Sequence, residues 1–166
     1  MTTRTAPALD ATLDRDTRGL YDALSELIRV YQFRDRDRIC CYDVSVTQCY
    51  ALEALVRRGA LTLNELAAHL FLDKSTASRV VDALERKGYV ARRPHPQDGR
   101  ALQLEATAAG RTLHTRIEGD ILEEERRLLA DFAPDVRQAM TRLIAGLARA
   151  AAGRVETGGG SCCRTG

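Results

Sequence analysis

Residues 72–110, LDKSTASRVVDALERKGYVARRPHPQDGRALQLEATAAG, decide the fold of this chain. The segment up to Gly88 has apolar residues at helical spacing, Asp73 suits its N-cap, and glycine is the usual residue at a helix end. YVARR and ALQLEA then predict two short strands, and PHPQDGR between them holds the Pro, Asp and Gly of a hairpin tip. Thr107 is expected to cap the helix that follows the hairpin.

A shorter helix is expected just before this stretch. Thr62 and Glu65 in TLNE have the capping-box pattern, which predicts a helix through Leu70. Three residues, 71–73, separate it from the next helix, and this is the spacing of a helix-turn-helix. A hairpin directly after the second helix predicts a winged helix, in which that helix enters the major groove of DNA and the wing reaches the neighbouring backbone or minor groove.

Longer helices are expected on both sides of this unit. Apolar residues have helical spacing over residues 10–33, and the charge run RDRDR after them favours a loop or a frayed helix end. SVTQ, with Ser45 as its cap, predicts a helix to Arg58. Two more helices are expected, over about 108–131 and from Pro134 to about 152.

The predicted fold class is mainly α with a small β-hairpin wing, that is, a winged helix-turn-helix with long dimerisation helices. One domain is expected over 10–152, with a DNA-binding lobe over about 45–106 and dimerisation helices over about 10–33 and 108–152. The last two helices carry Leu and Ile on more than one side, which favours an interface between subunits. The N-terminus (1–9) and the Gly-rich tail (153–166) are expected to be flexible.

Composition agrees with a soluble, globular chain. Its 166 residues are 45 % hydrophobic and 29 % charged, and no apolar run approaches the roughly 20 residues of a membrane-spanning helix. No signal-peptide pattern is present at the N-terminus, so we expect a cytoplasmic protein with reduced thiols and no membrane partner. The net charge is only +2, but residues 73–100 hold seven basic and four acidic residues. The basic charge is therefore concentrated in the segment predicted to form the second helix of the helix-turn-helix and the wing.

These residues resemble the MarR family of winged-helix regulators. The resemblance is densest over 72–110, where Asp98 and Arg100 form the Asp-x-Arg of the wing and Thr107 and Gly110 form the Thr-x-x-Gly that opens the next helix. It extends over about 10–152, and it implies a homodimer in which the first and the last two helices of the subunits interlock. The expected partner is double-stranded DNA, an operator with two-fold symmetry whose half-sites lie about one helical turn apart.

Most of the expected DNA-binding residues lie at the start of the second helix of the reading unit. Arg79 can read guanine with two hydrogen bonds, small hydroxyls can contact bases or phosphates, and Lys74 suits a phosphate. Arg92 and Arg93 are phosphate candidates in the strand, although one must point away because strand side chains alternate. The full predicted set is Lys74, Ser75, Thr76, Ser78, Arg79, Arg92, Arg93 and Arg100.

In the wing, the resemblance implies that Asp98 orients an arginine while an arginine enters the minor groove. The residue between Asp98 and Arg100 is Gly99, where family members often carry a second arginine. Arg100 is therefore left to serve either as the structural partner of Asp98 or as the groove contact.

Five cysteines are the feature outside the general family pattern. Cys40, Cys41 and Cys49 lie within ten residues, and Cys162 and Cys163 lie in the tail. Three thiolates can hold trivalent arsenic or antimony, and four can hold zinc or cadmium, so a thiophilic ion is the favoured effector of a repressor. No organic cofactor is expected, and the chain is not expected to be an enzyme, because it has no CxxC, no phosphate loop and no His/Asp set around its thiols.

Three alternatives for regulation stay open. Cys49, in the first turn of a capped helix, could be the thiol of a hydroperoxide sensor. It could also be a small buried hydrophobic residue, as free cysteine often is. The family resemblance, in turn, suggests an aromatic or phenolic small molecule as the ligand.

Overall fold

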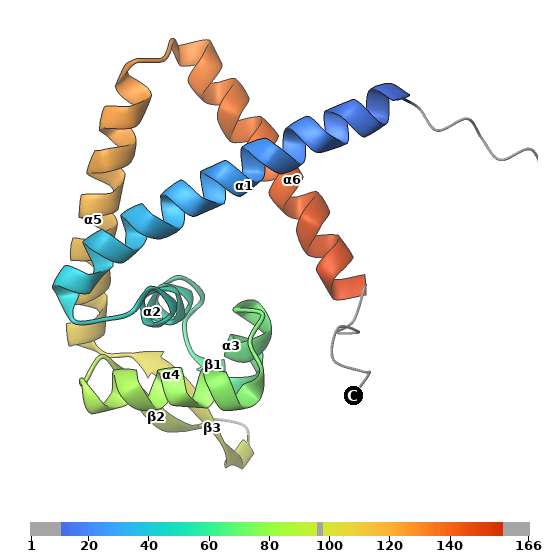
Figure 1. Cartoon of the computed structure of the whole chain (residues 1–166). Coiled ribbons are helices and arrows are strands. Elements are labelled where there is room, and N and C mark those ends of the chain that lie inside the picture. The colour runs from blue at the N-terminus through green and yellow to red at the C-terminus, as the bar shows by residue number, and fades with distance from the viewer. Residues whose placement is uncertain (1–10, 96–97, 158–166) are drawn as a thin grey trace, which may run out of the picture. The chain divides into compact units, whose positions relative to one another are not determined.

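The computed structural model describes residues 11–95 and 98–157, and it has the predicted mainly helical winged helix-turn-helix fold (Figure 1). The elements are, in chain order, α1 (Ala11–Ile39), η1 (Cys40–Tyr42), α2 (Val46–Arg58), β1 (Leu61–Thr62), α3 (Leu63–His69), α4 (Lys74–Arg86), β2 (Val90–His95), β3 (Asp98–Ala106), α5 (Ala108–Ala130) and α6 (Pro134–Thr157).

The chain forms two compact units, Met1–Ile121 and Leu122–Gly166, and the division falls within α5. The first unit holds the reading lobe, in which α2, α3, α4 and the sheet share one core. This core is aliphatic, and its fully buried side chains include Leu52, Leu55, Leu66, Leu84 and Leu104. One residue from nearly every element of the lobe is thus fixed against the others, so the core sets the position of α4.

The wing is a three-stranded antiparallel sheet in the order β1-β3-β2, whereas the sequence predicted only the hairpin. Leu61 and Thr62 pair with Leu104 and Gln103 of β3. Two residues are too short to show an alternating pattern, so this strand exists only because β3 provides its partner. The pairing fixes the start of α3 directly on the sheet.

Both predicted capping boxes are confirmed. The Ser45 hydroxyl accepts the amide N–H of Gln48 at 3.2 Å while the Gln48 side chain accepts the amide of Ser45. Thr62 and Glu65 make the same reciprocal pair at the start of α3. These caps set where α2 and α3 begin, and hence the angle at which each leaves the preceding loop.

The expectation for the RDRDR run was wrong, because α1 continues through it to Ile39. The guanidinium of Arg34 lies 4.0 Å from the ring centre of Tyr31, and that of Arg36 lies 4.7 Å from the ring centre of Phe33. These cation–π contacts occur at i,i+3 spacing on the helix, and Ile39 is 1 % exposed at its end. A buried end and stacked arginines make this charged segment helical.

Both units expose large apolar side chains. α1 exposes Leu13, Leu20, Tyr21, Ile28 and Phe33, and in the second unit α6 exposes Leu143 and Ile144 at 73 % and 56 %. α6 also runs to Thr157, past the predicted end at 152. None of the described helices is long and apolar enough to cross a membrane.

Candidate nucleic-acid interface

The start of α4 is fixed by Asp73, which confirms the predicted cap. One carboxylate oxygen accepts the amide N–H of Thr76 at 2.8 Å and the hydroxyl of Ser75 at 2.6 Å, and the other accepts the hydroxyl of Thr76 at 2.6 Å. These hydrogen bonds, that of Ser75 first, hold the pKa of Asp73 far below its ordinary value. The hydroxyl protons of Ser75 and Thr76 are donated to the Asp73 carboxylate, so towards DNA these two hydroxyls can act only as hydrogen-bond acceptors.

α4 has one buried side and one exposed side. Ala77, Val81 and Leu84 are fully buried, and they hold the helix on the core. Lys74, Ser75 and Arg79 are exposed, and Ser78 is half-buried. In the part of the chain that the structure describes, neither Lys74 nor Arg79 has an ion-pair partner, so both cations are available to DNA.

The two arginines of β2 are in different environments. Arg92 is 29 % exposed, its guanidinium lies 2.5 Å from Asp82, and it also pairs with Glu85. Both carboxylates belong to α4, so Arg92 ties the strand to the recognition helix. Arg93 is exposed and points to the other face, as alternation requires. The phosphate contact remains a prediction for both, and the geometry favours Arg93.

The tip of the wing is described only in part. A hairpin forms as predicted, but its strands are longer than expected: β2 runs to His95, β3 begins at Asp98 and these two residues pair, so 94–95 and 98–100 of the predicted turn belong to the strands. The side chains of Asp98 and Arg100 lie outside the described part, and their roles remain predictions.

The Thr-x-x-Gly motif has a clear physical function. The Thr107 hydroxyl donates to the carbonyl oxygen of Gly88 at 2.7 Å and accepts the amide of Gly110 at 3.0 Å. The amide of Thr107 donates to the carbonyl of Tyr89. These bonds join the two residues between α4 and β2, Gly88 and Tyr89, to the start of α5, so the motif fixes the wing to the helix that follows it.

The structure places the two described thiols differently. Cys41 is exposed in η1, and Cys49 is a buried core residue at 6 % exposure. Val44 and Cys49 stand at the N′ and N4 positions of α2, the two positions of a hydrophobic staple, and both are in the same buried cluster. Packing therefore accounts for Cys49 by itself.

The described residues do not test the predicted five-cysteine ion site. Among the described residues no three His, Cys, Asp or Glu side chains gather in a way that could hold a metal ion. The side chain of Cys40 is not described, and Cys162 and Cys163 lie beyond residue 157. The five-cysteine site stays a prediction.

Sequence reasoning missed the contacts that hold η1. Tyr42 donates a hydrogen bond to Asp120 of α5, which raises the pKa of Tyr42, and the guanidinium of Arg116 lies 5.4 Å from the centre of its ring. Lys87, directly after α4, donates to the carbonyl oxygen of Asp43. The partners are 44 and 78 residues apart in sequence, so no local pattern could have indicated these pairs.

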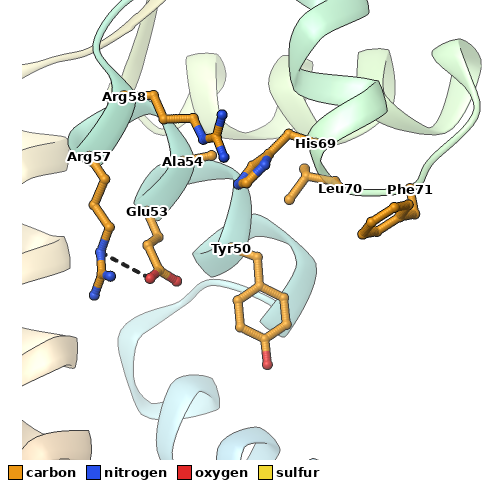
Figure 2. Close-up of a pocket in the computed structure, with 8 residues that line it drawn as sticks. All are labelled: Tyr50, Glu53, Ala54, Arg57, Arg58, His69, Leu70 and Phe71. Carbon is orange, nitrogen blue, oxygen red and sulfur yellow. Dashed lines mark ion pairs between the residues drawn. The ribbon is translucent and has the colours of Figure 1, made fainter. Parts of the chain in front are cut away.

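A pocket of about 650 Å³ lies between α2 and the helix-turn-helix turn (Figure 2). The rings of Tyr50 and Phe71 line it, and Arg58 and His69 extend toward one another across it. Phe71 is 64 % exposed and has a left-handed backbone with φ of 53°, two residues before the cap of α4. The strained turn of the reading unit therefore forms one wall of this pocket.

Comparison with known proteins agrees with this geometry. The model of the MarR family matches residues 42–101. An HTH-type transcriptional regulator of Mycobacterium leprae is 34 % identical over 104 residues, which are 61 % of this chain and 70 % of that protein. The HTH-type transcriptional regulator SarZ of Staphylococcus saprophyticus is 31 % identical over 105 residues, 63 % of this chain and 69 % of that protein.

Solved structures show the same fold. A MarR family protein from Bacillus stearothermophilus superposes with a TM-score of 0.76 at 23 % identity, over 82 % of this chain and 95 % of that one. Wild-type MarR from E. coli gives 0.68 at 19 % identity, over 77 % and 95 %. With the capped α4, its exposed cations and the three-stranded wing, these similarities establish that the chain belongs to the MarR family of DNA-binding, helix-turn-helix transcriptional regulators.

Proposed function

We propose that this regulator is a homodimeric repressor that binds an operator with two-fold symmetry and leaves it when a thiophilic ion binds cysteines near the α1–α2 junction. The observation that carries the DNA-binding role is the exposed side of α4, where Lys74 and Arg79 have no ion-pair partner in the described chain while the opposite side is fully buried. A helix held in this way presents its first turns to a groove as one rigid unit.

The effector proposal rests on Cys41. Its side chain is exposed in a three-residue turn between α1 and α2, so an ion in solution can reach it. Cys40 is its neighbour in sequence, and Cys162 and Cys163, which lie outside the described residues, follow a glycine run in the sequence. Three such thiolates can hold trivalent arsenic or antimony, and four can hold zinc or cadmium.

DNA reading is tested on an operator selected from a random duplex library with the fully reduced protein. Arg79→Ala is expected to weaken binding to the selected duplex by about 1–3 kcal/mol and to relax the sequence preference at one base pair. Lys74→Ala is expected to weaken binding to all duplexes alike and to reduce the slope of log affinity against log salt concentration by about 1. Unchanged sequence preference and salt slope in both variants would contradict the assignment of α4 as the reading helix.

The effector is tested by titrating the protein–operator complex separately with arsenite, zinc and cumene hydroperoxide. Release by arsenite near stoichiometry, absent in a Cys40→Ser/Cys41→Ser variant, supports an ion sensor. Release only by hydroperoxide, reversed by reductant, supports the redox alternative. Equal release of the wild type and a variant without cysteines rules out both thiol mechanisms.

A second candidate, an aromatic ligand, is favoured by two pockets. Besides the pocket of Figure 2, a cavity of about 520 Å³ lies between α1 and α2 and is lined by Ile28, Tyr31, Gln32, Arg36, Val46 and Tyr50. Its size and its mixture of apolar walls with one cation suit a small aromatic anion. Release of DNA by benzoate in the variant without cysteines would favour this candidate over the ion.

A further inference from the structure

We propose that Lys87 is the positioning residue that transmits events at the thiol-bearing turn η1 to the recognition helix. This inference rests on the proposed thiol control of DNA binding, and it names the contact through which that control reaches α4.

Lys87 directly follows the last residue of α4 and contacts the start of α2. It is the C-cap residue of α4; its amide donates to the carbonyl of Ala83, and the amide of the following Gly88 donates to the carbonyl of Glu85. Its Nζ donates to the backbone carbonyl of Asp43, and lies 3.6 Å from the Asp43 carboxylate and 3.4 Å from Oε1 of Gln48. Gln48 is the capping-box residue of α2. One ammonium group thus joins the end of the recognition helix to the loop and to the first turn of α2.

The loop that Lys87 holds has little freedom. Asp43 has φ of 57°, a left-handed conformation that costs energy for any residue but glycine, and surrounding contacts must maintain it. Val44 follows it and is 5 % exposed. Tyr42 precedes it and is hydrogen-bonded to Asp120 of α5. The turn is therefore held on one side by α5 and on the other by Lys87.

Ion binding demands a change in this turn. A thiolate site needs its sulfurs within bonding distance of one ion, about 2.3 Å for zinc. Cys41 is exposed while Cys49 is buried at 6 %, and no three ligating side chains are gathered among the described residues, so an ion site that includes Cys41 has to be assembled from sulfurs that are not yet together. Cys41 is next to Tyr42 and two residues before Asp43. We expect a movement of Cys41 toward another sulfur to shift the backbone of Asp43, whose carbonyl Lys87 holds, and with it the end of α4.

The experiment compares three variants with the wild type. Lys87→Met keeps the apolar stem and removes the ammonium, and Lys87→Arg keeps the charge. Arg86→Met is the matched control, because Arg86 is an exposed cation at the same helix end with no ion-pair partner among the described residues. For each protein the operator Kd is measured without arsenite and with saturating arsenite, and arsenite binding is measured separately by the loss of titratable thiols.

Lys87→Met is expected to bind arsenite as the wild type does while the ratio of the two Kd values falls from tenfold or more to near one. Lys87→Arg is expected to restore part of the ratio, and Arg86→Met to retain it in full whatever its affinity for DNA. If Lys87 served folding alone, Lys87→Met would not lose the effect of arsenite on the operator Kd while keeping wild-type arsenite binding. A wild-type ratio in Lys87→Met would overturn the proposal.

A second probe separates failure of this inference from failure of the ion proposal. In a background that keeps only Cys41, N-ethylmaleimide adds the thiol across its double bond and places a bulky group on η1. The adduct is expected to weaken operator binding at least fivefold when Lys87 is present and less than twofold in Lys87→Met. If arsenite has no effect but this difference appears, only the ion is wrong. If the adduct acts equally in both proteins, the role of Lys87 is wrong.

Discussion

At the scale of single residues, Gly110 shows how closely α5 approaches Tyr89, the residue just before β2. A Cβ added there would overlap the carbonyl oxygen of Tyr89 and lie 3.1 Å from Cδ1 of Leu52. That carbonyl accepts the amide of Thr107, so it cannot move away without loss of this hydrogen bond. Glycine at this position is required by space and not by backbone conformation.

Gly110→Ala is expected to destabilise the fold by about 1–3 kcal/mol, because backbone must shift to admit the methyl group. Gly119→Ala is the matched control in the same helix, since nothing lies within 4 Å of its added Cβ. It is expected to stabilise by about 0.5–1 kcal/mol through helix propensity alone. Urea unfolding of both variants measures the difference, and equal effects would show that the contact with Tyr89 is unimportant.

The neighbours Arg92 and Arg93 are expected to have separate functions. Arg92→Met removes the partner of Asp82 and Glu85 and is expected to lower the free energy of unfolding by about 1 kcal/mol. Arg93→Met is expected to leave stability unchanged and to reduce the salt slope of DNA binding by about 1. Urea unfolding and anisotropy at several salt concentrations check both. The reverse pattern would show that the strand faces DNA with its other side.

These two arginines also show what sequence alone could not decide. Alternation along a strand indicated that one of them points away from DNA, because strand side chains have a period of two. Which one does so depends on Asp82 and Glu85, on a helix that precedes the strand by several residues, and on how the two elements cross. Lys87 and Tyr42 were missed for the same reason. Their partners are set by tertiary packing, which no local spacing encodes.

At the scale of elements, the helix starts that are marked by an N-capping side chain could be predicted from the sequence. Ser45, Thr62 and Asp73 cap helices where the sequence predicted them, because a hydroxyl or carboxylate at the N-cap satisfies free amides locally. β1 and the end of α1 were not predicted. The first depends on pairing with β3, and the second on a buried Ile39 and on arginines stacked over aromatic rings.

The cap of α4 gives a pH-dependent prediction. Asp73 has a lowered pKa in the folded state, so its charge stabilises the fold above the ordinary aspartate pKa of about 3.9, and this contribution is lost as the pH falls toward the lower folded value. Asp73→Asn is therefore expected to have a lower Tm than the wild type at pH 7, and the difference is expected to shrink below about pH 4. Asp22→Asn, on an exposed part of α1, controls for the change in net charge. A difference that persists unchanged at pH 3 would show that the carboxylate charge does not matter to the cap.

At the scale of the whole molecule, the exposed apolar side chains must be explained together with DNA reading. A single α4 can read one half-site, and a repressor with two-fold symmetry needs two. α1 and α6 each expose several large apolar residues, among them Leu20 and Ile28 on α1, more than isolated surface residues require. In this family dimerisation is general, and these two helices are the surfaces that we expect to be covered.

Leu143→Glu with Ile144→Glu tests this surface, since these side chains are 73 % and 56 % exposed on α6. The double variant is expected to have half the mass of the wild type by light scattering, because two buried carboxylates per subunit oppose association. Its affinity for a duplex with two half-sites is expected to fall by about 100-fold, as linked binding is lost, while its affinity for one half-site stays near that of a single lobe. Arg142→Glu, an exposed neighbour on the same helix, is the control and is expected to remain dimeric. A double variant that keeps the dimer mass would place the interface on other helices, and α1 would be tested next with Leu20→Glu and Ile28→Glu.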